Sequence, residues 1–386
     1  MTSAAARDYD VIVAGGGIVG AACALACAQA GLHIALVEHD IIGGGATAAG
    51  MGHIVVMDDS EAQFALTRRS QQLWHDLAKH LPMTAEFETT GTIWVATDEE
   101  EFAEAERKHQ YLLQRAVPSR MLSAAELAVA EPNLRVGVAG GLLVSEDAVV
   151  YPPVVALHLA RQLHCLDAEV ILGHISQFAQ GEAQLTDGTR LRAPRLVNAL
   201  GANSPEITPG IPLKKRKGHL AITDRYPGFV RHQLVELGYL KSAHSTTSDS
   251  VAFNVQPRQT GQILIGSSRQ YGNEDPVVNQ AILSSMLQRA ELYMPAIGEL
   301  NVIRIWTGFR AATPDKLPLI GPNPGDPTLW LATGHEGLGI TTALATAELL
   351  ACAFNGNVSP IESGPYLPAR FDSTRPANTL IHQETV

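Results

Sequence analysis

Three glycines near the start of the chain have the spacing of a main-chain site for a pyrophosphate. Gly15, Gly17 and Gly20 form a GxGxxG pattern directly after the apolar run at residues 9–14. Gly15 allows a tight turn, and Gly17 lets the backbone approach a pyrophosphate at the positive end of a helix. Gly20 permits close packing of helix against strand. The pattern therefore predicts dinucleotide binding, the alternative being an ordinary glycine-rich turn.

The segments around these glycines must form a strand, a helix and a second strand to hold such a ligand. Residues 9–14 predict a buried parallel strand, and residues 21–30 predict an apolar helix that Gly31 ends. A second strand at 33–38 finishes at Glu38, whose carboxylate could accept hydrogen bonds from ribose hydroxyls and would repel a 2′-phosphate. This βαβ unit disfavours NADP but does not by itself distinguish FAD from NAD.

The segment after Glu38 lacks large side chains from Gly43 to Gly50. Such a stretch lets main-chain amides approach a flat ring system closely. The alternative is a flexible surface loop. The small residues favour a ring-bearing cofactor beside the dinucleotide site.

The composition limits the class of protein. The chain has 386 residues, 46% hydrophobic and 17% charged, which suits two packed and possibly interleaved domains. Its net charge of −11, without a broad basic face, argues against nucleic-acid binding. Four cysteines without a CxxC pair fit a reducing compartment, and no metal site is expected. Glycines interrupt the apolar residues 11–31, so we expect no transmembrane segment and a cytoplasmic protein, with peripheral attachment to the inner membrane left open.

Three further segments, together with the small-residue loop, resemble the D-amino-acid oxidase/glycine oxidase (DAO) family of FAD-dependent oxidoreductases. Residues 191–204 resemble the family's strand and Ala-x-Gly turn, and residues 333–351 resemble its closing glycine-rich turn and helix. Residues 306–321, WTGFRAATPDKLPLIG, resemble the pattern W-x-G-x-R-P-x-T-x-D-x-x-P-x-I-G, with Ala311 in place of the usual proline. Lys217-Gly218 stands where relatives usually carry Arg-Gly.

The resemblance implies an α/β fold with a Rossmann-like, glutathione-reductase-type FAD-binding domain and an interleaved α+β substrate domain built on an antiparallel sheet. The FAD domain would be discontinuous, with the substrate domain inserted and a polar tail at the end. The expected bounds are 1–85, 142–220 and 305–370 for the FAD domain, 86–141 and 221–304 for the substrate domain, and 371–386 for the tail. Sequence patterns predict helices at 61–80, 99–116 and 277–297 and a hairpin at 251–268.

The same resemblance implies which residues contact the FAD. The cofactor would be non-covalent, because residues 311–351 contain no cysteine. The expected contacts are Gly15, Gly17, Ile18, Val19, Gly20, Glu38, His39, Gly44, Gly45, Ala46, Thr47, Ala49, Gly50, Met51, Ile175, Ala199, Gly201, Arg310, Gly334, Gly337, Leu338, Gly339, Ile340 and Thr341.

Arg310 is the main candidate for substrate binding, because an arginine at this position of the family pattern binds the substrate carboxylate. Its planar fork can hold both oxygens and orient the α-carbon over flavin N5. The alternative is a structural arginine paired with Asp315. Weaker catalytic candidates, each with a packing role as its alternative, are Phe253 with its neighbour Asn254, Tyr239, Tyr271, His53 and His335.

Residues 43–59 and 306–321 further resemble the D-hydroxyproline dehydrogenase branch of the family. This resemblance implies hydride transfer from cis-4-hydroxy-D-proline or a related D-imino acid to FAD, giving a pyrroline carboxylate. A quinone or an electron-transfer subunit would reoxidise the flavin, and a homo- or hetero-oligomer is left open. The rivals are an oxygen-using glycine, sarcosine or D-amino-acid oxidase, a non-catalytic FAD-binding subunit and an NAD dehydrogenase.

Overall fold

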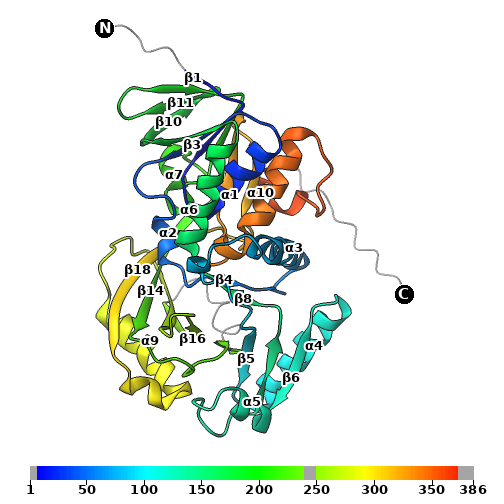
Figure 1. Ribbon diagram of the computed structural model, residues 1–386, viewed down its shortest axis with the longest axis vertical. Helices are drawn as coiled ribbons and strands as arrows, with labels where there is room; N and C mark the ends of the chain where they lie inside the picture. The colour runs from blue at the N-terminus through cyan, green and yellow to red at the C-terminus, as the bar shows by residue number, and fades with distance from the viewer. Residues whose placement is uncertain (1–6, 239–248, 373–386) are drawn as a thin grey trace.

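The computed structural model describes residues 7–238 and 249–372, and these form two regions around separate sheets (Figure 1). A six-stranded sheet with helices α1, α6 and α10 makes up the nucleotide region, and an eight-stranded sheet makes up the second region. The expected α/β fold with an interleaved second sheet is confirmed. Among the described residues, no helix combines the length and the apolar character needed to cross a bilayer.

The six-stranded sheet has the order β19-β20-β13-β2-β3-β9 and is parallel except for β19. Every residue of the central strand β2 is buried, which explains its continuous apolar sequence. The strands are β2 (Val11–Ala14), β3 (Ile34–Glu38), β9 (Ala168–Leu172), β13 (Arg195–Asn198), β19 (Leu319–Asn323) and β20 (Asp326–Thr333).

The apolar helix α1 (Ile18–Gln29) packs against α6 (Pro152–Gln162) and α10 (Gly339–Asn355). Helix α3 (Glu61–Ala78) lies on α10, where the indole of Trp74 donates to the carbonyl of Thr341 at 3.0 Å. Cys23 and Cys27 of α1 are buried in this core, as their apolar surroundings predict. These contacts hold the first turns of α1 and α10 in place.

A separate four-stranded sheet has the order β1-β12-β11-β10 and covers one side of the nucleotide region. Its strands are β1 (Arg7–Asp8), β10 (Ile175–Ala179), β11 (Glu182–Leu185) and β12 (Arg190–Arg192). A two-stranded sheet pairs β4 (His53–Ile54) with β8 (Ala148–Val149).

The eight-stranded sheet has the order β18-β14-β17-β16-β15-β5-β7-β6 and is antiparallel apart from the pair β15 and β5. Helix α9 (Gln280–Tyr293) packs on β16 and β17, while α4 (Glu99–Gln114) and α5 (Ala124–Ala130) pack on β6 and β7. The strands are β5 (Thr92–Ala96), β6 (Ser119–Ser123), β7 (Gly140–Val144), β14 (Lys214–Thr223), β15 (Gln233–Glu236), β16 (Ser250–Pro257), β17 (Ile263–Tyr271) and β18 (Val302–Ala312).

Two details differ from the sequence expectations. The chain passes between the regions near residues 214 and 312, because β14 and β18 are long strands that pair along their whole length in the second sheet. The bounds expected at 220 and 305 cut through these strands. The small-residue loop contains a short helix, α2 (Gly45–Ala49), because alanine-rich sequence allows a helical turn.

Asp147 is a buried carboxyl between the two regions, and it carries a pH prediction. Its Oδ1 accepts from Gln71 Nε2 at 2.9 Å and Val56 N at 3.2 Å, and burial raises its pKa to about 7. The folded state then binds more protons than the unfolded state above pH 4, so this group lowers stability as pH rises to 7. Between pH 5 and 7, we expect the free energy of unfolding of Asp147→Asn to fall by about 2 kcal/mol less than that of the unmodified protein. Urea unfolding at both pH values measures this difference. An unchanged pH dependence would contradict the raised pKa.

Candidate active site

The first turn of the nucleotide region can accept only glycine at two positions. Gly15 has a φ of +103°, and a Cβ there would lie 2.6 Å from the carbonyl oxygen of Ala199. A Cβ at Gly20 would lie 1.8 Å from the carbonyl oxygen of Gly15. Gly17 caps α1 without a side-chain hydrogen bond, and the amide of Ile18 donates to Thr47 Oγ1 at 3.0 Å. The turn therefore leaves the backbone open at the positive end of α1, which fits a pyrophosphate.

Glu38 organises this turn from the end of β3. Its carboxylate accepts from the amides of Gly16 at 2.6 Å, His39 at 2.8 Å and Asp40 at 3.0 Å. Its Oε1 also lies 2.7 Å from His39 Nδ1, whereas Oε2 accepts only from Gly16 among the described residues and keeps a lone pair for a ribose hydroxyl. The position of Glu38 fits the expected dinucleotide.

Small residues also bring the two regions close together beside α2. A Cβ at Gly308 of β18 would lie 2.4 Å from the Cβ of Ala49, and one at Gly50 would lie 2.6 Å from Ile340 Cδ1. A Cβ at Gly266 would lie 3.0 Å from the sulfur of Met51. Here, "small-residue layer" means Ala49, Gly50, Gly266 and Gly308. The side chains of Met51, Leu220 and Ile340 border these small residues. A backbone that other groups can approach this closely fits the plane of a flavin ring.

The glycine-rich turn before α10 faces the same place. Gly334 has a φ of +78°, and a Cβ at Gly337 would lie 3.6 Å from Arg310 Nε. The hydroxyl of Thr341 donates to the carbonyl of His53 at 2.8 Å, which ties α10 to β4. The 17-residue helix thus presents an N-terminus without a side-chain cap, where negative charge is stabilised.

Other expected cofactor contacts lie at the edges of this arrangement. Ala199 follows β13 and donates its amide to the carbonyl of Ala14 at 2.9 Å, and Gly201 has a φ of +57°. Ile175 begins β10 and is buried. All three lie at strand ends of the nucleotide region, which suits the roles that the resemblance implied.

Arg310 projects from β18 over Gly218 of the neighbouring strand. A Cβ at Gly218 would lie 2.4 Å from Arg310 Nη1, so glycine there makes room for the guanidinium. Nη1 donates to the carbonyl of Ser268 at 2.9 Å. Burial, followed by the charge of Arg216, lowers the pKa of Arg310 to about 10. The expected alternative partner, Asp315, instead pairs with Arg370 at 2.6 Å. Within the described residues, Arg310 has no carboxylate partner, so it can bind an anion.

His53 lies close to Arg310 and offers an unused polar atom. Its Nδ1 is 3.0 Å from Gln233 Nε2, while its Nε2 is buried without a hydrogen-bond partner in the described part of the chain. Burial, with Arg310 as a second cause, lowers the pKa of His53 to about 4. A neutral imidazole is therefore available to a bound molecule.

The remaining catalytic candidates lie in different surroundings, some in the packed core and some with polar atoms that lack a partner in the described residues. Phe253, one of the weaker catalytic candidates, has the packing role that was its alternative: it stacks on Tyr293 with ring centroids 4.4 Å apart in the core under α9. Side chains alternate along a strand, so the adjacent Asn254 points to the opposite face, where its buried Oδ1 lacks a partner among the described residues. His335 Nε2 is 3.0 Å from Thr346 Oγ1, and burial lowers its pKa to about 3. Tyr239 lies outside the described residues.

Two charged residues that the sequence reasoning missed also belong to the site. Arg216 of β14 forms an ion pair with Glu336, which follows His335 in the glycine-rich turn and has a φ of +52°. The guanidinium of Arg216 lies 4.6 Å from the ring of Tyr271. Alternation in the run Lys214 to Lys217 could have separated Arg216 from Lys215, which shares the opposite face of β14 with the buried Lys217, but it could not tell which face is turned toward the site.

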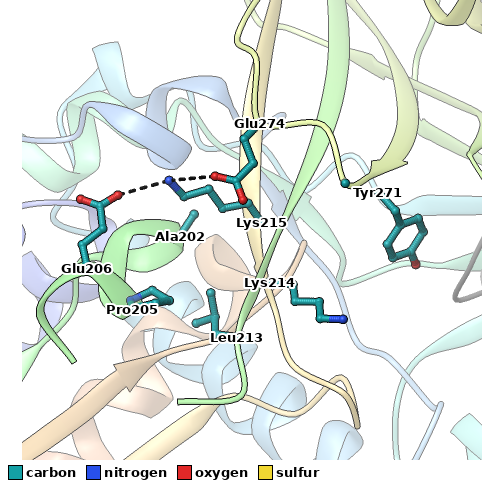
Figure 2. A pocket seen from close by; sticks show the side chains of 9 residues that line it. Ala202, Pro205, Glu206, Leu213, Lys214, Lys215, Tyr271 and Glu274 are labelled. Carbon is teal, nitrogen blue, oxygen red and sulfur yellow. Dashed lines mark hydrogen bonds and ion pairs between the residues drawn. The ribbon is translucent and has the colours of Figure 1, made fainter. Parts of the chain in front are cut away.

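A groove of about 660 Å³ opens beside these residues at the start of β14. Figure 2 shows Lys215 between Glu206 and Glu274, at 3.2 Å and 3.6 Å, while the ring of Tyr271 points away from them. Tyr271 therefore belongs both to the groove and to the surroundings of Arg216. The groove is lined by Ala202, Pro205, Glu206, Leu213, Lys214, Lys215, Tyr271, Gly272 and Glu274.

Comparison with known proteins gives consistent results over most of the chain. The family model DAO, described as FAD dependent oxidoreductase, matches residues 10–353. Hydrogen cyanide synthase subunit HcnC of Pseudomonas aeruginosa is 29% identical, covering 95% of this chain and 97% of that protein. A glycine oxidase of the same organism is 27% identical, covering 93% and 98%.

Solved structures share the fold. A glycine oxidase from Geobacillus kaustophilus aligns with a TM-score of 0.83 at 23% identity, over 94% of this chain and 99% of that one. An L-proline dehydrogenase from P. horikoshii aligns with a TM-score of 0.83 at 23% identity, over 96% and 100%.

Proposed function

The chain belongs to the DAO family of FAD-dependent oxidoreductases, and from that premise we propose that it oxidises the Cα–N bond of a small amino or imino acid. FAD is its cofactor. The turn at Gly15 to Gly20, Glu38 and the small-residue layer would hold it, with the N-terminus of α10 at one end. No cysteine lies between residues 311 and 351, which supports non-covalent binding.

Arg310 carries the proposal, because it is a guanidinium without a carboxylate partner in the described chain, next to the small-residue layer. It would bind the α-carboxylate of the substrate through two parallel hydrogen bonds and thereby orient Cα. When bound, FAD supplies the acceptor for the hydride that leaves Cα. The nitrogen loses a proton, and the product is an imine.

The charges around Arg310 also favour the reactive form of the substrate. An ammonium group is repelled by nearby guanidiniums, so its pKa falls and the neutral amine is favoured. The buried Nε2 of His53 is available for a hydrogen bond to that amine or to the ring. His53 and Asn254 are therefore proposed as further contacts of the reacting molecule.

Within this class, cis-4-hydroxy-D-proline is the candidate that the sequence resemblance implies, with a pyrroline carboxylate as product. A relative named as a subunit, HcnC, supports reoxidation through a partner or quinone. The glycine oxidases among the relatives favour a second candidate, an oxygen-using oxidase of glycine, sarcosine or a D-amino acid.

The test is an anaerobic screen of the purified protein with D-hydroxyproline, D-proline, glycine, sarcosine and opines, followed by flavin absorbance. We expect at least one of these to bleach the flavin. Peroxide production in air would then identify an oxidase, and its absence a dehydrogenase. Failure of every amino and imino acid to reduce the flavin would support a non-catalytic subunit and overturn the proposal.

A further inference from the structure

Three amide side chains lie together on one face of the eight-stranded sheet. Asn254 and Gln256 are two residues apart on β16, so they project from the same face. The register of β15 with β16 pairs Val235 with Asn254, and it therefore places Gln233 opposite Gln256. Side chains directly opposite each other on neighbouring strands share a face and lie about 5 Å apart at Cβ. Here, "amide cluster" means Gln233, Asn254 and Gln256.

The amide cluster is turned toward the small-residue layer. Asn254 pairs in register with Gly266 of that layer, where a Cβ would lie 3.0 Å from the sulfur of Met51. Gln256 Nε2 donates to the carbonyl of Met51 at 2.8 Å. The cluster therefore borders the space in which the reaction is proposed to occur.

Arg310 lies on the same face of the sheet. Leu220 of β14 pairs with Trp306 of β18, and Trp306 precedes Arg310 by four residues. A Cβ at Gly266 would lie 2.8 Å from Leu220 Cδ2, so this face continues from β18 to β16. A molecule held by Arg310 can therefore extend along the sheet toward the amide cluster.

The amide nitrogens of the two glutamines are used, but their oxygens are not. Gln256 Nε2 binds the carbonyl of Met51, and Gln233 Nε2 is 3.0 Å from His53 Nδ1. Oε1 of both glutamines and Oδ1 of Asn254 are buried without a hydrogen-bond partner among the described residues. The two glutamines are 2% and 0% exposed. A buried acceptor that stays unpaired is costly, so these oxygens indicate a bound donor.

His53 adds a donor to these acceptors. With Gln233 Nε2 as the donor, Nδ1 of His53 accepts, so the neutral ring carries its proton on Nε2. This Nε2 is buried without a partner in the described part of the chain. A neutral imino acid has one N–H and a neutral amino acid has two, so the reacting amine cannot satisfy all three amide oxygens.

The remaining group of the ligand must be able both to donate and to accept. A hydroxyl does both, whereas an ammonium group only donates. The nearby charge of Arg310 also disfavours a second cation. An ordered water has the same hydrogen-bonding capacity as a hydroxyl, so it is the alternative that an experiment must exclude.

We propose that the substrate carries a hydroxyl group on its side chain or ring, and that Gln233 and Gln256 recognise this hydroxyl. The hydroxyl would donate to Oε1 of one glutamine and accept from His53 Nε2, while Asn254 contacts the reacting amine. This inference rests on the proposed function and narrows it to hydroxylated amino or imino acids. cis-4-Hydroxy-D-proline belongs to this class, whereas glycine and sarcosine do not.

Compounds that differ by one hydroxyl test the inference without any variant. cis-4-Hydroxy-D-proline is compared with D-proline, and D-serine with D-alanine, by the anaerobic rate of flavin reduction divided by the dissociation constant. We expect the hydroxylated member of the better pair to exceed its partner at least about tenfold, since the partner leaves buried polar atoms unpaired. cis-4-Fluoro-D-proline has a substituent of similar size that cannot donate, so it should react like D-proline.

Variants connect the preference to the two glutamines. Methionine has a similar length but no amide oxygen, so Gln233→Met and Gln256→Met should each reduce the preference for the hydroxylated compound about tenfold. A purely structural role would lower both rates together and leave their ratio unchanged. Gln63→Met is the control, because Gln63 is also buried with an Oε1 that lacks a partner in the described chain, but it belongs to α3. That variant should keep the ratio of the unmodified protein.

The outcomes separate the two proposals. Equal reduction within both pairs would mean that water occupies the place, and it would overturn the proposed hydroxyl. A fluoro compound as good as the hydroxy compound, or an unchanged ratio in both glutamine variants, would overturn it as well. The proposed Cα–N oxidation would survive each of those results. Absence of flavin reduction by all compounds would contradict the proposed function and this inference together.

Discussion

Arg310→Gln is expected to lower kcat/KM for the substrate by roughly a thousandfold while the protein keeps its FAD. Removing one partner of a buried charge pair costs about 2–5 kcal/mol, and poor orientation of Cα adds to the loss. The guanidinium projects over Gly218 toward the carbonyl of Ser268, whereas the pyrophosphate turn is built by other residues. Steady-state kinetics and flavin absorbance of the purified variant measure the two effects separately.

Two further variants distinguish substrate binding from general damage at this place. Arg310→Lys keeps the charge but loses the fork, so it should recover only part of the rate. Gly218→Ala does not replace Arg310 itself. The new Cβ of residue 218 would lie 2.4 Å from Arg310 Nη1, so the guanidinium must move. It should therefore weaken binding in the same direction with FAD retained. Unchanged kinetics in Arg310→Gln would contradict the assigned role.

The parts of the site that sequence could predict are those determined by neighbouring residues. Gly15 and Gly20 belong to one turn, and the clash that a Cβ would cause involves the backbone of that turn or of the adjacent strand. The strand ending at Glu38 follows from an apolar pattern of ordinary length. The helix that the family resemblance implied within residues 333–351 is α10, which extends to Asn355. Helix α9 begins at Gln280 because Asn279 caps it, three residues after the expected start.

The parts that sequence could not predict depend on pairing between distant strands. Arg216 and Arg310 are 94 positions apart, and only the register of β14 with β18 places them opposite each other. The core position of Phe253 could not be predicted for the same reason, because a shift of one residue in β16 exchanges the two faces of the strand. Sequence identified the strand but not the face, so Asn254 was given no more weight than Phe253.

Gly20→Ala is expected to abolish FAD binding and to destabilise the fold by at least about 3 kcal/mol, the upper range for overpacking. A Cβ at this position would lie 1.8 Å from the carbonyl oxygen of Gly15 and 3.3 Å from the Cβ of Ala199. Both neighbours belong to the turn or to the strand end beside it, so α1 must move away from the sheet. The flavin-to-protein absorbance ratio and thermal unfolding report the two losses.

Two other glycines make this prediction specific. A Cβ at Gly17 would meet only Thr47 Oγ1, at 3.2 Å, so Gly17→Ala should fold and lose FAD affinity through obstruction of the pyrophosphate approach. Gly364 has open space around it and an ordinary φ, so Gly364→Ala should match the unmodified protein in colour and stability. If Gly20→Ala bound FAD as tightly as Gly364→Ala, close packing of α1 against the turn could not be what holds the pyrophosphate site open. Gly17→Ala leaves that packing intact. If this variant loses FAD but keeps its stability, the cause is blocked access to the N-terminus of α1 and not an unstable turn.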